Sequence, residues 1–556
     1  MASSAKDTVL SPEHINKLID EGVAIVLLDR KVLKVPNGFL KHHPGGDNVI
    51  KHMVGRNAQD EIDAFHPKSV KREMLRYQVG IVAEKWVNVT PPIQREQVAK
   101  EVKHANERAI RDAQHRTTTG ELPEFLIQDD SSSDSASSSG ASVFDDSLLS
   151  RYRSHASFAS SRTSLSSADV SDAEDEKEGN GAEESSDQKT LAEITDSFRE
   201  LVAKLEGRGL YETPYWAYAG DAFRVALNFT IMLLFLRSGW YLTSAVFMGC
   251  FWHQLVFTAH DAGHRSITHD LHWDSMIGMT LGNYLGGLSL GWWKRAHNIH
   301  HIVCNDPAHD PDIEHLPFMA ISPALFQSLY STHFDRILPF DKFAQTMVPY
   351  QKYMYYPLLC FGRFNLYALS LEFLVMDLGP KCNRWHRFYE LVGQAFFWYW
   401  FGYLLVYCSI PTWTLRVAFV LVSHCVTMPL HVQFTLSHFA MGTVTPGPNE
   451  PWAMQQLRTT MDVDCPAWMD WFHGGLQFQA VHHLFPSLPR HNLRQASQEV
   501  KAWSKSVGIK YEIYGFQECN GRVLSRLEEV GRQARFFVEC QDKILEKGDF
   551  MRGEWE

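Results

Sequence analysis

The sequence predicts a small α+β domain joined by a disordered linker to an all-α membrane domain with four transmembrane helices. The membrane domain follows from long runs without Asp, Glu, Lys or Arg, at residues 238–259, 391–415 and 417–449. Each run is long enough to cross a hydrocarbon core, which needs about 20 helical residues. A fourth apolar run, at 222–236, ends before Arg237. The mean hydropathy of −0.23 conceals these runs because a polar, serine-rich segment dilutes the average.

The N-terminal part, residues 8–92, is expected to be a compact α+β unit. Ser11 and Pro12 form a helix start, since serine is a good N-cap and proline fits the first helical position. Residues 23–28 and 32–35 are apolar enough to form short strands. A polar connector, residues 93–127, follows this unit.

Residues 128–189 are predicted to be a disordered linker. Segment 128–190 carries 14 acidic and 5 basic residues and is rich in serine, so it cannot bury enough apolar surface to fold. This segment accounts for most of the net charge of −11. The remainder is nearly neutral, and we expect no nucleic-acid partner.

An amphipathic helix is expected at 190–209, where Thr190 and Glu193 form a capping box. The membrane domain then spans 210–520, and a C-terminal cytosolic tail covers 521–556. Spans near 222–237 and 239–259 form one predicted hairpin, and spans near 389–410 and 413–433 form a second. Segment 350–376 is interrupted by Arg363 and Glu372, so an interfacial or buried helix pair is expected there.

The N-terminus lacks the apolar core of a secretory signal peptide, which predicts that it stays in the cytosol. Two hairpins then return the chain to the cytosol, so both termini are expected there. The nine cysteines form no CxxC pair, as expected for a reducing compartment.

Three histidine clusters occur beyond or at the ends of the second and fourth spans. Residues i, i+3 and i+4 share one face of a helix, so each cluster can direct several side chains at one place. Imidazole binds iron, copper, zinc or nickel, and so many ligands exceed the needs of one ion. The pattern therefore predicts two metals on the cytosolic side. The cluster residues are His260, His264, His297, His300, His301, Gln479, His482 and His483. Isolated histidines are instead expected to be structural: His253, His269, His272, His315 and His424.

The N-terminal unit contains its own histidine pair, His43 in His-Pro-Gly-Gly and His66 in Phe-His-Pro. Two histidines on opposite sides of a porphyrin leave iron without an open position, which suits electron transfer. With this motif and spacing, residues 8–92 resemble cytochrome b5. The resemblance implies heme b, with His43 and His66 as axial ligands.

Residues 210–520 resemble the membrane fatty acyl desaturases, which share HxxxH, HxxHH and H/QxxHH boxes. The resemblance implies two non-heme irons, held by the box histidines of this chain and by His438 after the last span. It also marks Asn305 and Asp312 as polar residues that support the ligands. Gln479 replaces the first histidine of the third box, and whether it binds iron is open.

Gln479 together with a fused heme domain is typical of front-end desaturases, and with the long serine-rich insert the chain most resembles the fungal sphingolipid Δ8-desaturases. The resemblance implies O2-dependent Δ8-desaturation of the sphingoid base of ceramide in the endoplasmic reticulum membrane. The electrons would come from an NADH-cytochrome b5 reductase. Four aromatic residues flanking the boxes could line a substrate tunnel: Trp292, Trp293, Phe478 and Phe485.

Three alternatives remain at this stage. A Δ5- or Δ6-type front-end acyl desaturase has the same motifs, and a di-iron lipid hydroxylase uses related chemistry. A heme-bearing membrane anchor that only donates electrons would leave the histidine boxes unexplained.

Overall fold

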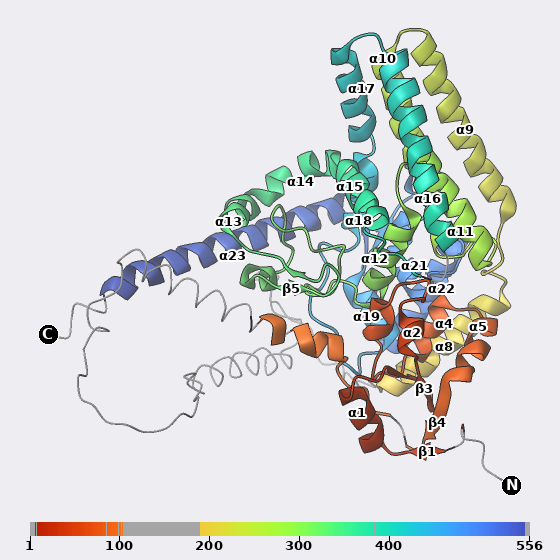
Figure 1. The fold of residues 1–556 in the computed structure, drawn as a ribbon, viewed down its shortest axis with the longest axis vertical. Helices are drawn as coiled ribbons and strands as arrows, with labels where there is room; N and C mark the ends of the chain where they lie inside the picture. Colours follow the sequence, from red (N-terminus) through yellow and green to blue (C-terminus); the bar gives the residue numbers. More distant parts are fainter. Residues whose placement is uncertain are drawn as a thin grey trace, which may run out of the picture. The chain divides into compact units, whose positions relative to one another are not determined.

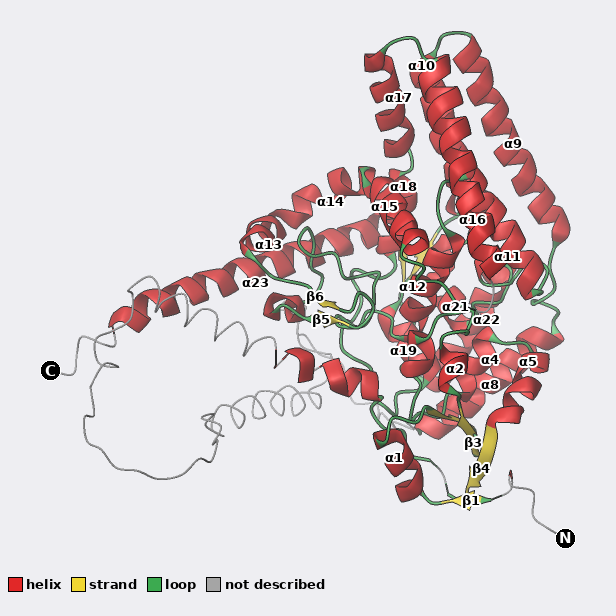
Figure 2. Cartoon of the chain, in the orientation of Figure 1, coloured by secondary structure: helices red, strands yellow, loops and turns green. Residues whose placement is uncertain are grey.

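The structure is a computed structural model that describes residues 6, 8–84, 86–97, 99–101, 103, 190–381 and 384–550, with side chains to residue 543. The linker predicted at 128–189 and most of the connector predicted at 93–127 lie outside these residues. All the described residues belong to one compact unit. Figures 1 and 2 show its helices and strands.

The N-terminal part contains a mixed four-stranded sheet with the strand order β1-β4-β3-β2. Both predicted strands are present, and the Ser11 side chain caps the first helix by accepting a hydrogen bond from His14 N. The sheet and α1 enclose a core that includes Ile15, Ile25 and Val32. The elements are β1 (Val9–Leu10), α1 (Pro12–Asp20), β2 (Ile25–Leu28), β3 (Lys31–Lys34), α2 (Asn37–Leu40), α3 (Asn48–Lys51), α4 (Gln59–Phe65), α5 (Lys68–Met74), η2 (Leu75–Tyr77) and β4 (Gln78–Val82).

Helix α8 (Leu191–Gly207) begins at the predicted capping box. Thr190 Oγ1 accepts from Glu193 N, and the Glu193 carboxylate accepts from Thr190 N. One face of the helix is buried through Ile194, Phe198, Leu201 and Leu205. These side chains join the largest described core, which also contains residues of the N-terminal domain and of the histidine-box helices.

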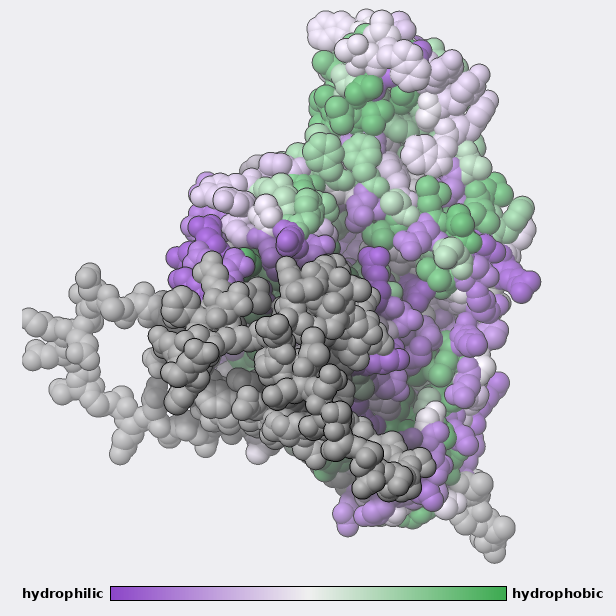
Figure 3. Space-filling model, turned by 60° about the vertical axis from the view of Figure 1, so that its left-hand side comes forward, coloured by the Kyte–Doolittle hydropathy of each residue, from purple (hydrophilic) through white to green (hydrophobic). Residues whose placement is uncertain are grey.

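Among the described residues, four helices are long and apolar enough to span a membrane, as predicted, and a bent pair at 342–360 and 362–375 would make a fifth if it counts as one span. The four are α9 (Tyr215–Arg237), α10 (Tyr241–Gly263), α16 with η7 (Arg384–Phe397 and Trp398–Cys408), and α17 with α18 (Trp413–Cys425 and Met428–Leu436). Figure 1 shows α9, α10, α16 and α17 in one bundle that projects away from the rest of the protein. Figure 3 shows hydrophobic residues gathered on this projecting part.

The interrupted segment near 350–376 forms α14 (Gln351–Cys360) and α15 (Gly362–Val375), with a bend of 67° in this region. Arg363 is buried beside the bend. Its Nε donates to Tyr367 Oη at 2.9 Å, and its guanidinium lies 4.0 Å from the Trp252 ring. The Arg363 guanidinium, which interrupts the apolar run, therefore has its partners inside the protein.

The last described helix is α23 (Phe516–Phe550). It runs without a break across residue 520, where we expected the membrane domain to end and a C-terminal tail to begin. Cys519, Val523 and Leu527 are fully buried in a core shared with α14. Gln351 Nε2 also donates to Leu527 O at 2.8 Å. At least the first half of this helix is thus part of the folded domain.

The remaining elements are mostly short and connect the spans to the histidine boxes. They are α11 (Leu271–Met279), η4 (Thr280–Leu285), α12 (Leu290–Ile302), η5 (Pro323–Gln327), β5 (Tyr330–Ser331), β6 (Arg336–Ile337), α13 (Lys342–Met347), η6 (Val348–Tyr350), α19 (Trp452–Thr459), β7 (Asp462–Asp464), η8 (Ala467–Met469), α20 (Asp470–His473), η9 (Leu476–Phe478), α21 (Gln479–Leu484), η10 (Arg490–Asn492), α22 (Leu493–Val507) and β8 (Ile513–Gly515).

Candidate metal centre and heme site

The three histidine boxes and His438 come from four separate parts of the fold. The first box is at the end of α10, the second is on α12, the third is on α21, and His438 follows α18. Helical spacing puts the members of each box on one face. The tertiary fold then brings these faces together.

Four imidazoles form a first group, made of His260, His264, His297 and His482, with ligand atoms all within 4.8 Å of one another. Both ring nitrogens of His264 and Nε2 of His482 are buried without a hydrogen-bond partner. Buried polar atoms are normally satisfied. The absence of a hydrogen-bond partner for these ring nitrogens is what we expect if they bind a metal ion.

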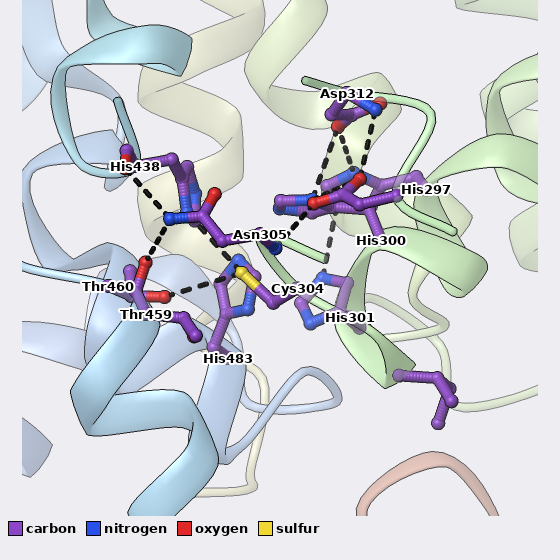
Figure 4. Close-up of polar contacts among 12 residues, drawn as sticks. His297, His300, His301, Cys304, Asn305, Asp312, His438, Thr459, Thr460 and His483 are labelled. Carbon is purple, nitrogen blue, oxygen red and sulfur yellow. Dashed lines mark hydrogen bonds and ion pairs between the residues drawn. The ribbon is translucent and has the colours of Figure 1, made fainter. Parts of the chain in front are cut away.

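A second group consists of His300, Cys304, His438 and His483, and all four are buried (Figure 4). His300 Nδ1 donates to Asp310 at 2.9 Å, and His483 Nδ1 donates to Gln456 Oε1 at 3.0 Å. These contacts fix the ring orientations and leave Nε2 of each ring for a metal. His483 Nε2 has no other partner.

His301, which we expected to be a ligand, belongs to neither group and lies between them. Its Nε2 is 3.1 Å from His297 Nε2 of the first group. Its ring stacks on His483 of the second group at a centroid distance of 4.1 Å. The structure therefore brings all eight predicted histidines together, with His301 at the junction.

Burial sets the charge of most of these rings. It lowers the pKa of His301, His438, His482 and His483 well below the usual value, so these rings are neutral, which is the form that binds metal. His300 differs, because the Asp310 and Asp312 carboxylates outweigh burial and raise its pKa to about 9.

Two residues of this centre were missed in the sequence. Cys304 follows His300 by four positions, and its Sγ lies 3.5 Å from His438 Nδ1. Burial raises the pKa of the thiol, although a bound metal would deprotonate it. Asp310 was missed although it stands two residues before Asp312. The sequence signal for Cys304 is its spacing of four from His300, just beyond the end of α12, and the signal for Asp310 is the repeated aspartate.

Asn305 and Asp312 both lie beside the predicted ligands. Asn305 Nδ2 donates to His438 O at 2.9 Å, and its backbone N donates to Asp310 Oδ2 at 2.7 Å. Asp312 Oδ2 is 3.8 Å from Nδ1 of both His297 and His300. Gln479 is buried at the start of α21, on the same helix face as His482 and His483.

The isolated histidines lie outside both groups, as expected. His253 Nε2, for example, donates to Phe472 O at 2.9 Å.

Of the proposed tunnel aromatics, Trp293 stacks on His297 at 4.4 Å, whereas Phe485 is fully buried and stacks on Phe198. Phe485 is therefore part of a core.

The heme-ligand pair of the N-terminal domain also suits its predicted role. The His43 and His66 rings face each other with centroids 6.1 Å apart. His43 Nδ1 bonds Gly46 O at 2.9 Å, and His66 Nδ1 bonds Ile62 O at 3.1 Å. Each ring therefore keeps Nε2 for an axial bond, and the gap fits one iron with metal–imidazole bonds of about 2 Å.

The heme-ligand pair and the metal groups are connected through Phe65. Its ring contacts His301 edge-on, with centroids 5.7 Å apart. Its carbonyl accepts a hydrogen bond from Arg265, the residue after His264, and Ser487 Oγ donates to the neighbouring Ala64 O at 3.2 Å. The segment that ends in His66 thus lies against the metal centre.

A buried charge cluster supports the first box. Arg490 Nη1 pairs with Asp261 Oδ2 at 2.5 Å, and Arg490 also pairs with Asp221. Tyr218 Oη donates to Asp261 Oδ2 at 2.6 Å. Asp261 stands next to His260, so this cluster holds the end of α10 against α9 and η10.

Sequence comparison agrees with both parts of this architecture. The fatty acid desaturase family matches residues 238–514, and the cytochrome b5-like heme/steroid binding domain matches residues 11–83. A Delta 8-(E)-sphingolipid desaturase of Emericella nidulans is 46% identical over 99% of both chains. The chain belongs to the fatty acid desaturase family. It is a membrane oxidoreductase with a fused cytochrome b5 domain that donates electrons to the desaturase.

Two further relatives differ in how much of the chain they cover. A Delta 8-(E)-sphingolipid desaturase of Kluyveromyces lactis is 43% identical over 96% of this chain and 94% of its own. A Delta(8)-fatty-acid desaturase of Helianthus annuus is 39% identical over 62% of this chain and 75% of its own. The expected resemblance to fungal sphingolipid desaturases is confirmed.

Proposed function

We propose that this protein introduces a trans Δ8 double bond into the sphingoid base of ceramide, using O2 and electrons relayed by its cytochrome b5 domain. The full-length similarity to fungal proteins of that name supports the substrate and the geometry of the bond. The two adjacent groups of four ligand atoms are the observation that carries the chemistry.

The proposed metal content is one heme b and two non-heme irons. His43 and His66 would hold the heme. His260, His264, His297 and His482 would hold one iron, and His300, His438 and His483 would hold the other. His301 lies at the junction between the two groups, and Cys304 is within reach of the second. When bound, the irons and O2 supply the oxidising power needed to remove hydrogen from an unactivated methylene.

The protein's own residues position these groups. Asp310 and Gln456 fix the rings of His300 and His483, and Arg490 holds the end of α10 that carries His260 and His264. Gln479 is proposed to orient the third box rather than to bind metal. The Phe65 contact with His301 supports a short distance between His66, the proposed heme ligand, and the second and third boxes.

We further propose that the protein lies in the endoplasmic reticulum membrane with both termini and all three boxes in the cytosol. Two apolar hairpins with a cytosolic N-terminus give this topology. It leaves the cytochrome b5 domain accessible to an NADH-cytochrome b5 reductase, the proposed electron source.

Expression in a yeast without Δ8-unsaturated sphingoid bases tests the proposal. Lipid analysis should show new trans double bonds at C8 of the long-chain base. Replacing His300 and His301 by alanine should abolish the product while leaving the heme absorbance spectrum intact, because His43 and His66 are unchanged. New double bonds confined to acyl chains, or a hydroxylated product, would overturn the proposed activity.

A further inference from the structure

A cavity of about 400 Å³ lies between α11, α12, α15 and α16, on the heme-domain side of α12. Its deep walls are apolar and include the buried side chains of Met279, Leu290, Phe373 and Leu374. Pro44 and Gly46, next to the heme ligand His43, also line it. We call it the α12 cavity.

The outer lining of the α12 cavity has the composition expected at a membrane surface. Leu271, Phe388 and Leu391 line the cavity and are also exposed, although they are large and hydrophobic. Lys381, Arg384 and Arg387 line it as well, near the start of the third span. Asp377, another lining residue, pairs with Lys381 and Arg387. Apolar side chains beside a cluster of basic ones are typical of the level where lipid head groups meet acyl chains.

Three buried or half-buried polar residues also line the α12 cavity, namely His386, Glu390 and Lys294. His386 Nε2 is buried and has no hydrogen-bond partner. Glu390 is 4% exposed, and Ser289 Oγ and Gly291 N both donate to its Oε1. No described carboxylate lies within ion-pair distance of Lys294, which also lines the cavity. Buried polar groups of this kind need partners, which a ligand can provide.

Helix α12 forms one wall of the cavity and also carries metal ligands. Leu290, Gly291 and Lys294 line the cavity, and His297 follows Lys294 by one turn on the same face. Leu290 and His297 are about 10 Å apart along the helix, at about 1.5 Å per residue. An alkyl chain that enters the cavity therefore has a short route along α12 to the metal groups.

We propose that the α12 cavity is the entry site from the membrane for the substrate and binds its polar end. The ligand class is an N-acylated long-chain base, whose hydroxyl and amide groups can bond Glu390, His386 and Lys294. Its alkyl chain would extend along α12 toward His297. This assignment rests on the proposed ceramide substrate.

Photolabelling of the full-length, metal-loaded protein in lipid nanodiscs tests the site. The probe is a ceramide that carries a diazirine in the long-chain base, close to its polar end. We expect labelled peptides from α11, α15 and α16, with labelling suppressed at least 5-fold by excess unlabelled ceramide. Labelling elsewhere, such as around Phe257 and Phe478, would overturn the proposal.

A matched pair of variants on α11 sharpens the test. Ser275→Phe fills the cavity, because Ser275 is buried and lines it, and should reduce labelling at least 5-fold. Ile277→Phe, on the same helix but outside the cavity lining, should label like the wild type. Equal labelling of both variants would contradict the proposal. Peptide mapping on the wild type decides the question if Ser275→Phe does not fold.

Competition separates this proposal from the proposed function. Labelling in the cavity that is displaced by phosphatidylcholine but not by ceramide would overturn the ceramide assignment and leave the entry site standing. Labelling outside the cavity, together with new Δ8 bases in the yeast lipids, would overturn the entry site alone. Glu390→Gln adds a kinetic readout, with a several-fold rise in KM for ceramide and a smaller change in kcat.

Discussion

Single hydrogen bonds decide which imidazole nitrogen is available at each site. His43 and His66 use Nδ1 on backbone carbonyl groups, His300 uses it on Asp310, and His483 uses it on Gln456. In each ring the other nitrogen remains for a metal. Such partners fix the orientation of the ligand and increase its basicity, so they affect metal affinity without touching the metal.

Asp310→Asn tests this role at the second metal group. The amide cannot provide the negative charge that raises the pKa of His300, so we expect the affinity of this group for iron to fall about 10- to 100-fold. Iron released to a chelator measures the effect. The heme absorbance should not change, and Asp335→Asn, at an exposed carboxylate, should retain iron like the wild type. Full iron retention in Asp310→Asn would contradict the role.

Arg490→Met should destabilise the membrane domain by about 3–5 kcal/mol, since it leaves the buried Asp261 carboxylate without its cationic partner and leaves Asp221 with only Arg224 and His491. Denaturant unfolding in detergent measures the loss. Arg494→Met removes a half-exposed pair with Asp470 and should cost about 1 kcal/mol or less.

The triple variant Asp221→Asn, Asp261→Asn and Arg490→Met distinguishes lost charge pairing from lost packing. Removing all three charges should recover much of the stability. A triple variant as unstable as Arg490→Met would show that Arg490 acts through packing instead.

Local patterns predict elements of this protein well where the signal lies within one helix. The capping box of α8, the Ser-Pro start of α1 and the apolar lengths of the four spans are such signals. The histidine spacing likewise places each box on one helix face. These features depend on neighbours in the sequence, so tertiary packing does not change them.

Features that depend on distant partners were not predictable in this way. Cys304 belongs to the second group only because α18 and α21 bring His438 and His483 to it. We expected residues 521–556 to be a C-terminal tail, but the buried face of helix α23 packs on α14. The division of the histidines into two groups, with His301 between them, also arises from tertiary packing alone.

Phe198→Ala tests whether α8 supports the third box. Phe198 is 3% exposed and stacks on Phe485, two residues after His483, at a centroid distance of 5.6 Å. Loss of a buried aromatic ring should destabilise the protein by about 3–5 kcal/mol, measured by denaturant unfolding. Leu191→Ala, at a half-exposed site of the same helix, should change stability by about 0.5 kcal/mol or less. Similar losses in both variants would rule out a specific role for Phe198.

On the scale of the whole molecule, the cytochrome b5 domain contacts the desaturase domain at several places. Arg199 on α8 pairs with Asp60 at 2.7 Å, and Asn48 Nδ2 donates to Thr332 O at 3.1 Å. The His52 ring packs edge-on against His309 at a centroid distance of 5.1 Å. Together with the Phe65 contact, these interactions hold the heme ligands near the metal groups, as intramolecular electron transfer requires.

The buried His52 makes this arrangement sensitive to acid. Burial, His309, Arg56 and Lys51 lower the pKa of His52 well below the usual value, and burial lowers that of the nearby His333 to about 4. In the unfolded chain these imidazoles bind a proton below about pH 6.5, whereas in the native protein they do not. Stability is therefore full above pH 6.5 and falls as the pH decreases below it, by up to about 1.4 kcal/mol per pH unit for each group.

His52→Phe should reduce this loss, because phenylalanine fills the site without a titrating group. We expect the thermal midpoint of the wild type to fall between pH 7 and pH 5.5, and that of His52→Phe to fall less. Differential scanning fluorimetry of the purified protein in detergent measures both slopes. His14→Phe, at an exposed position of α1, should keep the wild-type slope. An unchanged slope in His52→Phe would place the acid sensitivity elsewhere.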